Sequence, residues 1–309
     1  SEMCIRDSGG TDYTVAEVKE CLIKWVSVVC EFNFIDAAKL RRSTQEEFPA
    51  FLTLQEMRRF HPDWVIKRSL KLEDACTGKY VDEYLGVSHC WESKGEPDVR
   101  GVQLRTLRRL LNEKRYQRVK YVFYDKMSLP QRGANGLTRA EKAEFQKMLP
   151  NINIIYLGAS VVIFLDRSYF SRFWTGFEAW LSFRKATVDG LTDDDAKVED
   201  LRCNVACIHD TNEAFASAIR GEWQSADVDK AYEKLSSPDI YVTNMSDKLV
   251  QLAKLFLFDE TVRAVMRKEA IKDQTRGYTP RGYTPRSSAD STQQDLMQGS
   301  AALALRTPS

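Results

Sequence analysis

The stretch Ser160–Asp166, SVVIFLD, decides the fold of this chain. Five consecutive apolar residues stand between a serine and an aspartate, and three of them are β-branched. A short continuous apolar run of this kind predicts a strand buried on both faces, as in a parallel sheet. The segment after it, SRFWTGFEAWLSFRKA (171–186), predicts a helix capped by Ser171. Strand followed by helix is the repeating unit of a doubly wound α/β domain.

The same alternation runs through residues 81–270. Strands are predicted at 84–89, 119–124, 160–165, 201–208 and 240–243, with helical apolar spacing between them. These elements predict an α/β fold of the flavodoxin-like type, a doubly wound five-stranded parallel sheet with strand order 2-1-3-4-5. The core is expected to contain these residues: Leu85, Val87, Val122, Phe123, Val161, Ile163 and Leu165.

Three further segments flank this domain. Residues 1–10 include SEMCIRDS, which resembles translated sequencing-adapter DNA, and are expected to be an artefact or disordered. Residues 11–80 predict an N-terminal helical extension, beginning with an amphipathic helix over 14–31 that Thr14 caps. Residues 271–309 are poor in apolar side chains and contain the tandem RGYTPRGYTP, so they predict a disordered tail.

Composition argues against several classes of protein. With 45 basic and 44 acidic residues, the chain lacks the basic excess of a nucleic-acid-binding protein. No apolar run approaches the roughly 20 residues of a membrane span.

Seven scattered cysteines predict free thiols in a reducing compartment, and hence a cytoplasmic protein. Neither GxGxxG nor GxxxxGK occurs, which argues against a Rossmann dehydrogenase and a P-loop NTPase. The run CNVACIH (203–209) lacks a standard zinc spacing, so no metal site is predicted.

Polar and aromatic residues follow the first two predicted strands and mark the expected ligand site. In doubly wound sheets, ligands bind beyond the carboxyl ends of the strands. That rule selects Ser88, His89 and Trp91 after the first strand, and Asp125 after the second. Trp91 either stacks on a nucleotide ring or packs in the core, and His89 either lines the pocket or is structural. The loop 126–138 is long enough to be functional.

Glu178 is the one carboxylate in the apolar run that forms the predicted helix after Ser160–Asp166. Burying an unpaired charge costs several kcal/mol, so its position needs a reason. One interpretation is a solvated glutamate, or one paired with Arg172 or Arg184. The other is a carboxylate in an apolar-walled cleft, where it stabilises developing positive charge. Trp174, one turn earlier, would help to exclude water from such a cleft.

Several strings, in this order of elements, resemble a known family. The pattern Tyr-x-Ser-Arg-x-Trp-x-x-x-Glu at 169–178 is similar to the stretch that carries the catalytic glutamate in NAD-cleaving Toll/interleukin-1 receptor (TIR) domains. The following strings are closer in style to the heterokaryon-incompatibility (HET) domain, a fungal relative of TIR: VSHCW (87–91), YVFYDKMSLPQ (121–131) and YFSRFWTGFEAW (169–180). The resemblance covers roughly residues 81–268.

The resemblance implies a TIR-like domain in stress, immunity or cell-death signalling. Glu178 is then the expected catalytic residue of an NAD nucleosidase, with NAD as substrate and no cofactor required. Contacts with the nucleotide are expected from Ser88, His89, Trp91, Asp125 and Trp174. The alternative is a non-catalytic module that acts through protein–protein interaction. In either case the resemblance implies a homo-oligomer, while the balanced charge and the short apolar runs predict no nucleic-acid or membrane partner.

Overall fold

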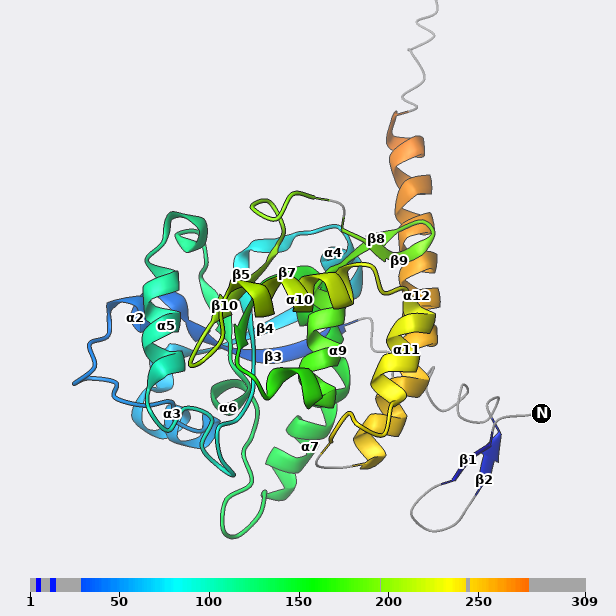
Figure 1. Cartoon of the computed structure of the whole chain (residues 1–309). Coiled ribbons are helices and arrows are strands. Elements are labelled where there is room, and N and C mark those ends of the chain that lie inside the picture. The colour runs from blue at the N-terminus through cyan, green and yellow to red at the C-terminus, as the bar shows by residue number, and fades with distance from the viewer. Residues whose placement is uncertain (1–3, 7–11, 15–28, 195, 243–244, 278–309) are drawn as a thin grey trace, which may run out of the picture. The chain divides into compact units, whose positions relative to one another are not determined.

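The computed structural model describes residues 4–6, 12–14, 29–194, 196–242 and 245–277. The chain divides into two compact units, Ser1–Ile271 and Lys272–Ser309. The first unit contains a six-stranded sheet with the order β10-β7-β5-β6-β3-β4 (Figure 1). Its strands are β3 (Val29–Asp36), β4 (Val65–Lys71), β5 (Tyr80–His89), β6 (Tyr121–Phe123), β7 (Ala159–Leu165) and β10 (Cys203–Cys207).

Four of the predicted strands occur in the predicted order. The strands β6, β5, β7 and β10 pair in parallel, which reproduces the order 2-1-3-4. The fifth prediction, a strand at 240–243, is wrong. Within 240–242 only one isolated bridge forms, between Arg172 and Tyr241, and residue 243 lies outside the described part of the chain. Four residues without a regular ladder gain too few hydrogen bonds to extend the sheet.

The predicted helical extension over 11–80 is also corrected, because it supplies two strands of the central sheet. Strand β3 pairs antiparallel with both β4 and β6, so the sheet is mostly rather than wholly parallel. Residues Val29–Glu31, expected to end a helix, begin β3 instead, and residues 15–28 lie outside the described residues. Thr14, expected as the cap of that helix, ends the short strand β2 (Asp12–Thr14), which pairs with β1 (Cys4–Arg6).

Alternate residues of the strands enter two separate hydrophobic cores. Val161, Ile163 and Leu165 face one core, whereas Val162 and Phe164 face the other. Side chains from the helices within residues 153–277 fill the first core, and those from the helices within residues 37–60 and 102–128 fill the second. The seven residues predicted to be buried are all at most 1% exposed. The sheet is therefore covered by helices on both faces, as its continuous apolar strands require.

Eleven α-helices occur in the described residues, and α9 occupies most of the helix predicted at 171–186. They are α2 (Ala37–Arg42), α3 (Leu54–Phe60), α4 (Leu72–Cys76), α5 (Val102–Leu111), α6 (Asp125–Ser128), α7 (Arg139–Met148), α8 (Asn153–Gly158), α9 (Phe173–Ser182), α10 (Glu213–Gln224), α11 (Val228–Ser236) and α12 (Met245–Gly277). Short 3₁₀ turns occupy Pro62–Trp64, Lys114–Tyr116, Leu149–Asn151 and Tyr169–Ser171. A hairpin of β8 (Arg184–Thr187) and β9 (Gly190–Asp193) follows α9.

Two predictions about helix ends are corrected. Arg172, not Ser171, is the N-cap of α9, and its side chain makes no capping hydrogen bond. Residues 271–277, predicted to belong to a disordered tail, continue α12 to Gly277, and the rest of that prediction, 278–309, lies outside the described residues. Among the described helices, none combines the length and the apolar character that crossing a membrane requires.

Candidate functional site

The candidate site lies at the carboxyl ends of the central parallel strands. Ser88 and His89 are the last two residues of β5, and both side chains are buried. Because successive residues of a strand point to opposite faces, Ser88 turns toward α9 while His89 turns toward the residues that follow β6. The end of one strand thus serves two polar clusters.

The first cluster is a chain of three hydroxyl and carboxyl groups that ends on Glu178. Ser88 Oγ donates to Glu178 Oε2 at 2.6 Å, and it lies 2.5 Å from the hydroxyl of Tyr169. Since a serine hydroxyl has one proton and gives it to Glu178, Tyr169 is the donor to Ser88. Glu178 therefore turns back over the end of β5, and pairs with neither Arg172 nor Arg184 in any hydrogen bond or ion pair described.

Burial raises the pKa of the Glu178 carboxyl to about 8. The negative charge of Asp125 acts in the same direction, while hydrogen bonds from Ser88 and Tyr156 and the charge of His89 lower the pKa. The residue keeps part of its surface accessible, although its carboxyl group is enclosed by protein. Glu178 is therefore a partly exposed residue whose desolvated carboxyl has a pKa of about 8.

The second cluster joins the end of β5 to the start of α6. His89 Nε2 lies 2.9 Å from Asp125 Oδ1, and Trp91 Nε1 donates to Asp125 Oδ2 at 2.7 Å. Burial alone would raise the pKa of Asp125, but the charge and hydrogen bond of His89 and the bond from Trp91 hold this pKa below its usual value. Burial lowers the pKa of His89, but Asp125 outweighs it and the net pKa is raised. Asp125 and His89 therefore form a buried hydrogen-bonded pair, which is an ion pair when His89 is protonated.

Aromatic residues that were not predicted hold His89 in place. The ring of Tyr124 stacks on His89 with centroids 4.1 Å apart, and Phe51 stacks on the other side of Tyr124 at 3.9 Å. Tyr124 donates its hydroxyl proton to Gln103 Oε1 at 2.9 Å. No local pattern marks Phe51 or Gln103 as site residues, because both lie in segments that look like ordinary helix or loop.

Trp174 lies outside both clusters, and the predicted loop 126–138 is partly helical. Trp174 is half-buried, and its described ring contacts are with Phe173 and Phe177 of its own helix, not with Glu178. The predicted loop 126–138 begins with the last three residues of α6, and Gln131 from this loop donates to the carbonyl of Asp125 at 3.1 Å. The structure thus joins Ser88 to Glu178, joins both His89 and Trp91 to Asp125, and places Trp174 in neither cluster.

A further charged cluster lies beyond the end of β10. His209 is the one described non-glycine residue with a positive φ, 53°. Its Nε2 lies 2.8 Å from Glu92 Oε1, and its Nδ1 lies 2.8 Å from a guanidinium nitrogen of Arg100. A left-handed backbone conformation is uncommon outside glycine, and here it lies beside this polar cluster.

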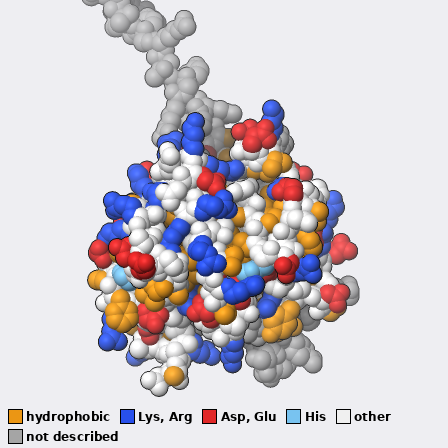
Figure 2. All heavy atoms as spheres, turned by 60° about the vertical axis from the view of Figure 1, so that its left-hand side comes forward, with side chains coloured by type: hydrophobic (Ala, Val, Ile, Leu, Met, Phe, Trp, Pro, Cys, Tyr) orange, Lys and Arg blue, Asp and Glu red, His pale blue; other side chains and the backbone are white. Residues whose placement is uncertain are grey.

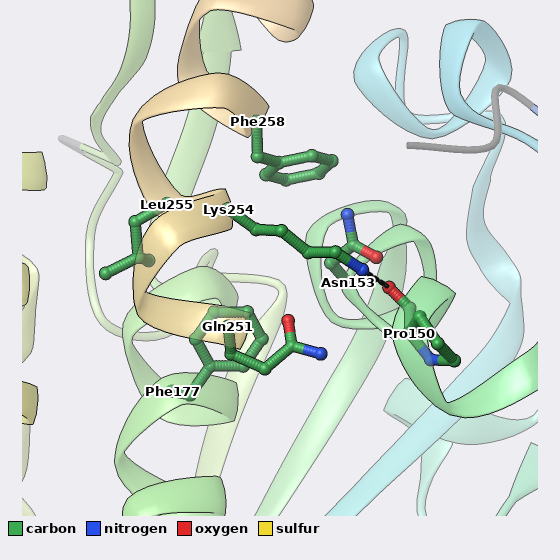
Figure 3. Close-up of a pocket in the computed structure, with 7 residues that line it drawn as sticks. All are labelled: Pro150, Asn153, Phe177, Gln251, Lys254, Leu255 and Phe258. Carbon is green, nitrogen blue, oxygen red and sulfur yellow. Dashed lines mark hydrogen bonds between the residues drawn. The ribbon is translucent and has the colours of Figure 1, made fainter. Parts of the chain in front are cut away.

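Two hollows on the described surface lie away from Glu178. A groove of about 560 Å³ is lined by the following residues: Glu31, Asn33, Arg58, Lys67, Ala140, Glu141, Ala143, Glu144, Lys147 and Met148. A smaller cavity of about 10 Å³ lies between α12 and the segment that starts α8 (Figure 3). Basic, acidic and hydrophobic side chains are interspersed on the face shown in Figure 2, in keeping with the net charge of +1.

Neither a metal site in the described residues nor a known relative of the chain is found. Among the described residues, no three His, Cys, Asp or Glu side chains are grouped to hold a metal ion. Comparison with known protein families, with curated proteins and with solved structures finds no match to this chain.

Proposed function

We propose that this protein is a TIR/HET-like, flavodoxin-like domain that hydrolyses the bond between nicotinamide and ribose in a nicotinamide nucleotide such as NAD. The observation that carries this proposal is Glu178, a partly exposed residue whose enclosed carboxyl lies at the carboxyl ends of the strands. Ligands bind at that edge in doubly wound sheets. A single carboxyl is enough for this reaction, because nicotinamide leaves as a neutral molecule and needs no acid.

The reaction can be written around the ionised form of Glu178. The C1′–N bond of the ribosyl nicotinamide breaks, both electrons go to nicotinamide, and the ribose becomes an oxocarbenium-like cation. The Glu178 carboxylate stabilises that cation more strongly than it would in water, because few water molecules surround the carboxyl group. Water then attacks C1′ and gives up a proton, so the products are nicotinamide, the ribosylated remainder and one proton.

The environment of Glu178 supports this role. Ser88 donates to the carboxylate, and Tyr169 supports Ser88, which fixes the orientation of the acting oxygen atoms. The nearby hydrogen-bonded pair of His89 and Asp125 is a separate anchor, with Trp91 beside it to stack on a base or on the nicotinamide ring. The pKa values of Glu178 and Asp125 are moved in opposite directions, as happens where two carboxyl groups take different roles.

The test is the release of nicotinamide from NAD by the purified full-length chain. Wild-type protein is expected to release it, and Glu178→Gln is expected to lose on the order of 10²–10³ in rate, since it loses one electrostatic contact. The matched control is Glu222→Gln, which changes a surface glutamate paired with Lys234 and should leave the rate unchanged. Normal turnover by Glu178→Gln, or no release by wild type at any protein concentration, would refute the proposal.

Assembly without catalysis is the second candidate function, and the exposed side of α12 favours it. Met245, Leu249 and Phe256 follow helical spacing along one side of the helix and are 61%, 38% and 38% exposed. Apolar side chains in such a row are suited to contact with a second copy of the chain. Sedimentation over a concentration series distinguishes a self-associating protein from a monomer, and Leu249→Glu should shift any association toward monomer.

The cellular setting belongs to the same proposal. Five cysteines in the described part of the chain are free thiols: Cys30, Cys76, Cys90, Cys203 and Cys207. Free thiols are typical of a reducing compartment, which supports a cytoplasmic role in stress, immunity or cell-death signalling.

A further inference from the structure

The start of α5, the helix that follows β5, is occupied by a carboxylate. In doubly wound sheets, the helix after the first parallel strand presents its N-terminal amides to a phosphate of the ligand. Here Asp98 Oδ1 accepts from the amide of Gln103 at 2.9 Å, and Asp98 Oδ2 accepts from that of Leu104 at 2.8 Å. Asp98 is 5% exposed. A buried carboxylate thus takes the place that a phosphate would need, and its charge repels a second anion.

The helices after the other parallel strands also have partners for their first turns. The first amide of α9, that of Phe173, donates to the carbonyl of Tyr241 at 2.8 Å. In α10, the amide of Ala214 donates to Asn212 Oδ1 at 3.0 Å. The short helix α6 begins with a carboxylate, that of Asp125. The helix starts at this edge are therefore directed to groups of the protein itself.

Negative charge accumulates around the candidate site. The buried ring of Tyr124, which stacks on His89, reports this charge. Burial raises the pKa of Tyr124, and four nearby carboxylates raise it further: Asp125, Asp98, Glu96 and Glu92. The charge of Asp125 also acts on Glu178. Such an edge attracts a cationic ligand and repels an anionic one.

Two cations that are not fully exposed at this edge are held by partners. Lys126 is 5% exposed, and its Nζ lies 2.7 Å from Glu96 Oε2. Arg172 is half-buried, and its guanidinium carbon lies 5.4 Å from the centroid of the Tyr241 ring. A phosphate that bound to either cation would have to compete with the partner already present.

The remaining cations near these strand ends are exposed to water. Arg100 donates to Nδ1 of His209, Arg167 lies directly after β7, and Arg132 lies in the loop after α6. Water and salt screen the charges of exposed side chains, so these three attract a phosphate only weakly. The buried carboxylates are screened less, and they decide the charge that a ligand meets.

We propose that the preferred substrate of the Glu178 site is a nicotinamide riboside without phosphate groups, whose pyridinium ring gives it a positive net charge. This inference rests on the proposed function and narrows its substrate class. Trp91, half-buried beside Asp125, offers its ring face to the pyridinium cation. The bonds that break and form are those of the proposed reaction, so the products are nicotinamide, ribose and a proton. NAD and other phosphate-bearing nucleotides are then slower substrates of the same site.

The first experiment compares nicotinamide riboside with nicotinamide mononucleotide, which differs only by a 5′-phosphate. That phosphate carries a charge of about −1.5 to −2 at neutral pH and makes the net charge negative. With the full-length protein at low salt, kcat/KM for nicotinamide release should be on the order of tenfold or more higher for the riboside, since charge at a site changes substrate capture by about 10–10³-fold. Added salt should narrow this gap, because it screens the carboxylates.

The outcomes separate this inference from the proposed function. Equal or faster turnover of the mononucleotide or of NAD would overturn the inference and leave the proposed function standing. If none of the substrates releases nicotinamide, the proposed function fails, and titration calorimetry compares binding of the riboside and the mononucleotide to the same protein. Tighter binding of the riboside supports the inference. Equal binding, tighter binding of the mononucleotide, or no binding of either overturns it.

A second experiment changes the carboxylate at the start of α5. Asp98→Asn removes one repelling charge and keeps an oxygen that accepts from an amide, so the preference for the riboside over the mononucleotide should fall severalfold. The matched control is Asp227→Asn. Asp227 also caps a helix, accepting from the amide of Lys230 at 2.9 Å, but its charge acts on Arg184, after the end of α9. Each preference is a ratio within one protein, so a smaller folded fraction cancels. An unchanged ratio in Asp98→Asn, or an equal fall in Asp227→Asn, would overturn the inference.

Discussion

Glu178 Oε2 lies 2.6 Å from Ser88 Oγ, so the helix after the third predicted strand meets the end of the first across 90 residues of sequence. This contact explains why a glutamate is tolerated in an apolar helix. Most side chains of α9 pack in the core, whereas the carboxyl group of Glu178 lies at the edge of the sheet. There the hydroxyl of Ser88 donates a hydrogen bond to it.

Replacing Ser88 with alanine tests the hydrogen bond directly. The bond from Ser88 lowers the pKa of Glu178, so Ser88→Ala should raise this pKa further above about 8. If the ionised carboxylate is the active form, kcat/KM for NAD should increase with pH through about pH 8 in wild type and at higher pH in the variant. The measurement is a pH–rate profile of both proteins. Superimposable profiles would mean that Ser88 does not tune Glu178.

Glu178→Gln should stabilise the protein in alkaline solution, independently of any activity. The folded-state pKa of Glu178 is raised above the ordinary value of 4.5. Such a group favours the folded state fully below its unfolded pKa, and this contribution is lost as pH rises through about 8. Glutamine has no charge to bury, so the variant should gain on the order of a few kcal/mol relative to wild type between about pH 5 and pH 9.

The measurement is denaturant unfolding of wild type and Glu178→Gln across that pH range. Glu222→Gln is again the control, because Glu222 lies at the surface beside Lys234 and should leave the pH dependence unchanged. A constant stability difference between Glu178→Gln and wild type at all pH values would contradict the burial of an ionisable carboxyl at this position.

Asp125→Asn should have the opposite pH dependence. The folded-state pKa of Asp125 lies below its usual value, so its contribution is present above the unfolded pKa and is lost as pH falls through the folded pKa. Asparagine cannot pair with the imidazolium of His89, and the loss of charged hydrogen bonds should cost about 1–3 kcal/mol near neutrality. The deficit relative to wild type should shrink in acid. Chemical denaturation at several pH values checks this, and a deficit that grows on acidification would be the wrong sign.

Ile163→Ala should destabilise the fold by roughly 2–5 kcal/mol, because it leaves a cavity in a packed core. Ile163 is fully buried and pairs in parallel with both Ser88 and Val205 in the centre of the sheet. The exposed Val188, 42% accessible on the β8–β9 hairpin, offers a control in Val188→Ala. Urea unfolding compares the two variants, and equal small losses in both would indicate that β7 is not central.

The local pattern of the sequence was sufficient for the parallel part of the sheet. The apolar runs in β7 and in the second half of β5 are stable between two layers of helices, and the strand order expected of a flavodoxin-like fold occurs here as β6-β5-β7-β10. Strands β3 and β4 were missed for a physical reason. Their stability comes from antiparallel pairing with each other and with β6, which are long-range contacts that periodicity does not record.

The candidate site, like the sheet, was predicted from the sequence only in part. The sequence by itself placed Ser88, His89, Trp91 and Asp125 at the carboxyl ends of strands, because that position follows from strand direction alone. Only the tertiary structure decided that Glu178 turns to Ser88, that Tyr169 supports Ser88, and that Tyr124 and Phe51 stack behind His89. Each of those contacts joins residues from different elements, and its free energy depends on burial and distance, which exist only once the chain has folded.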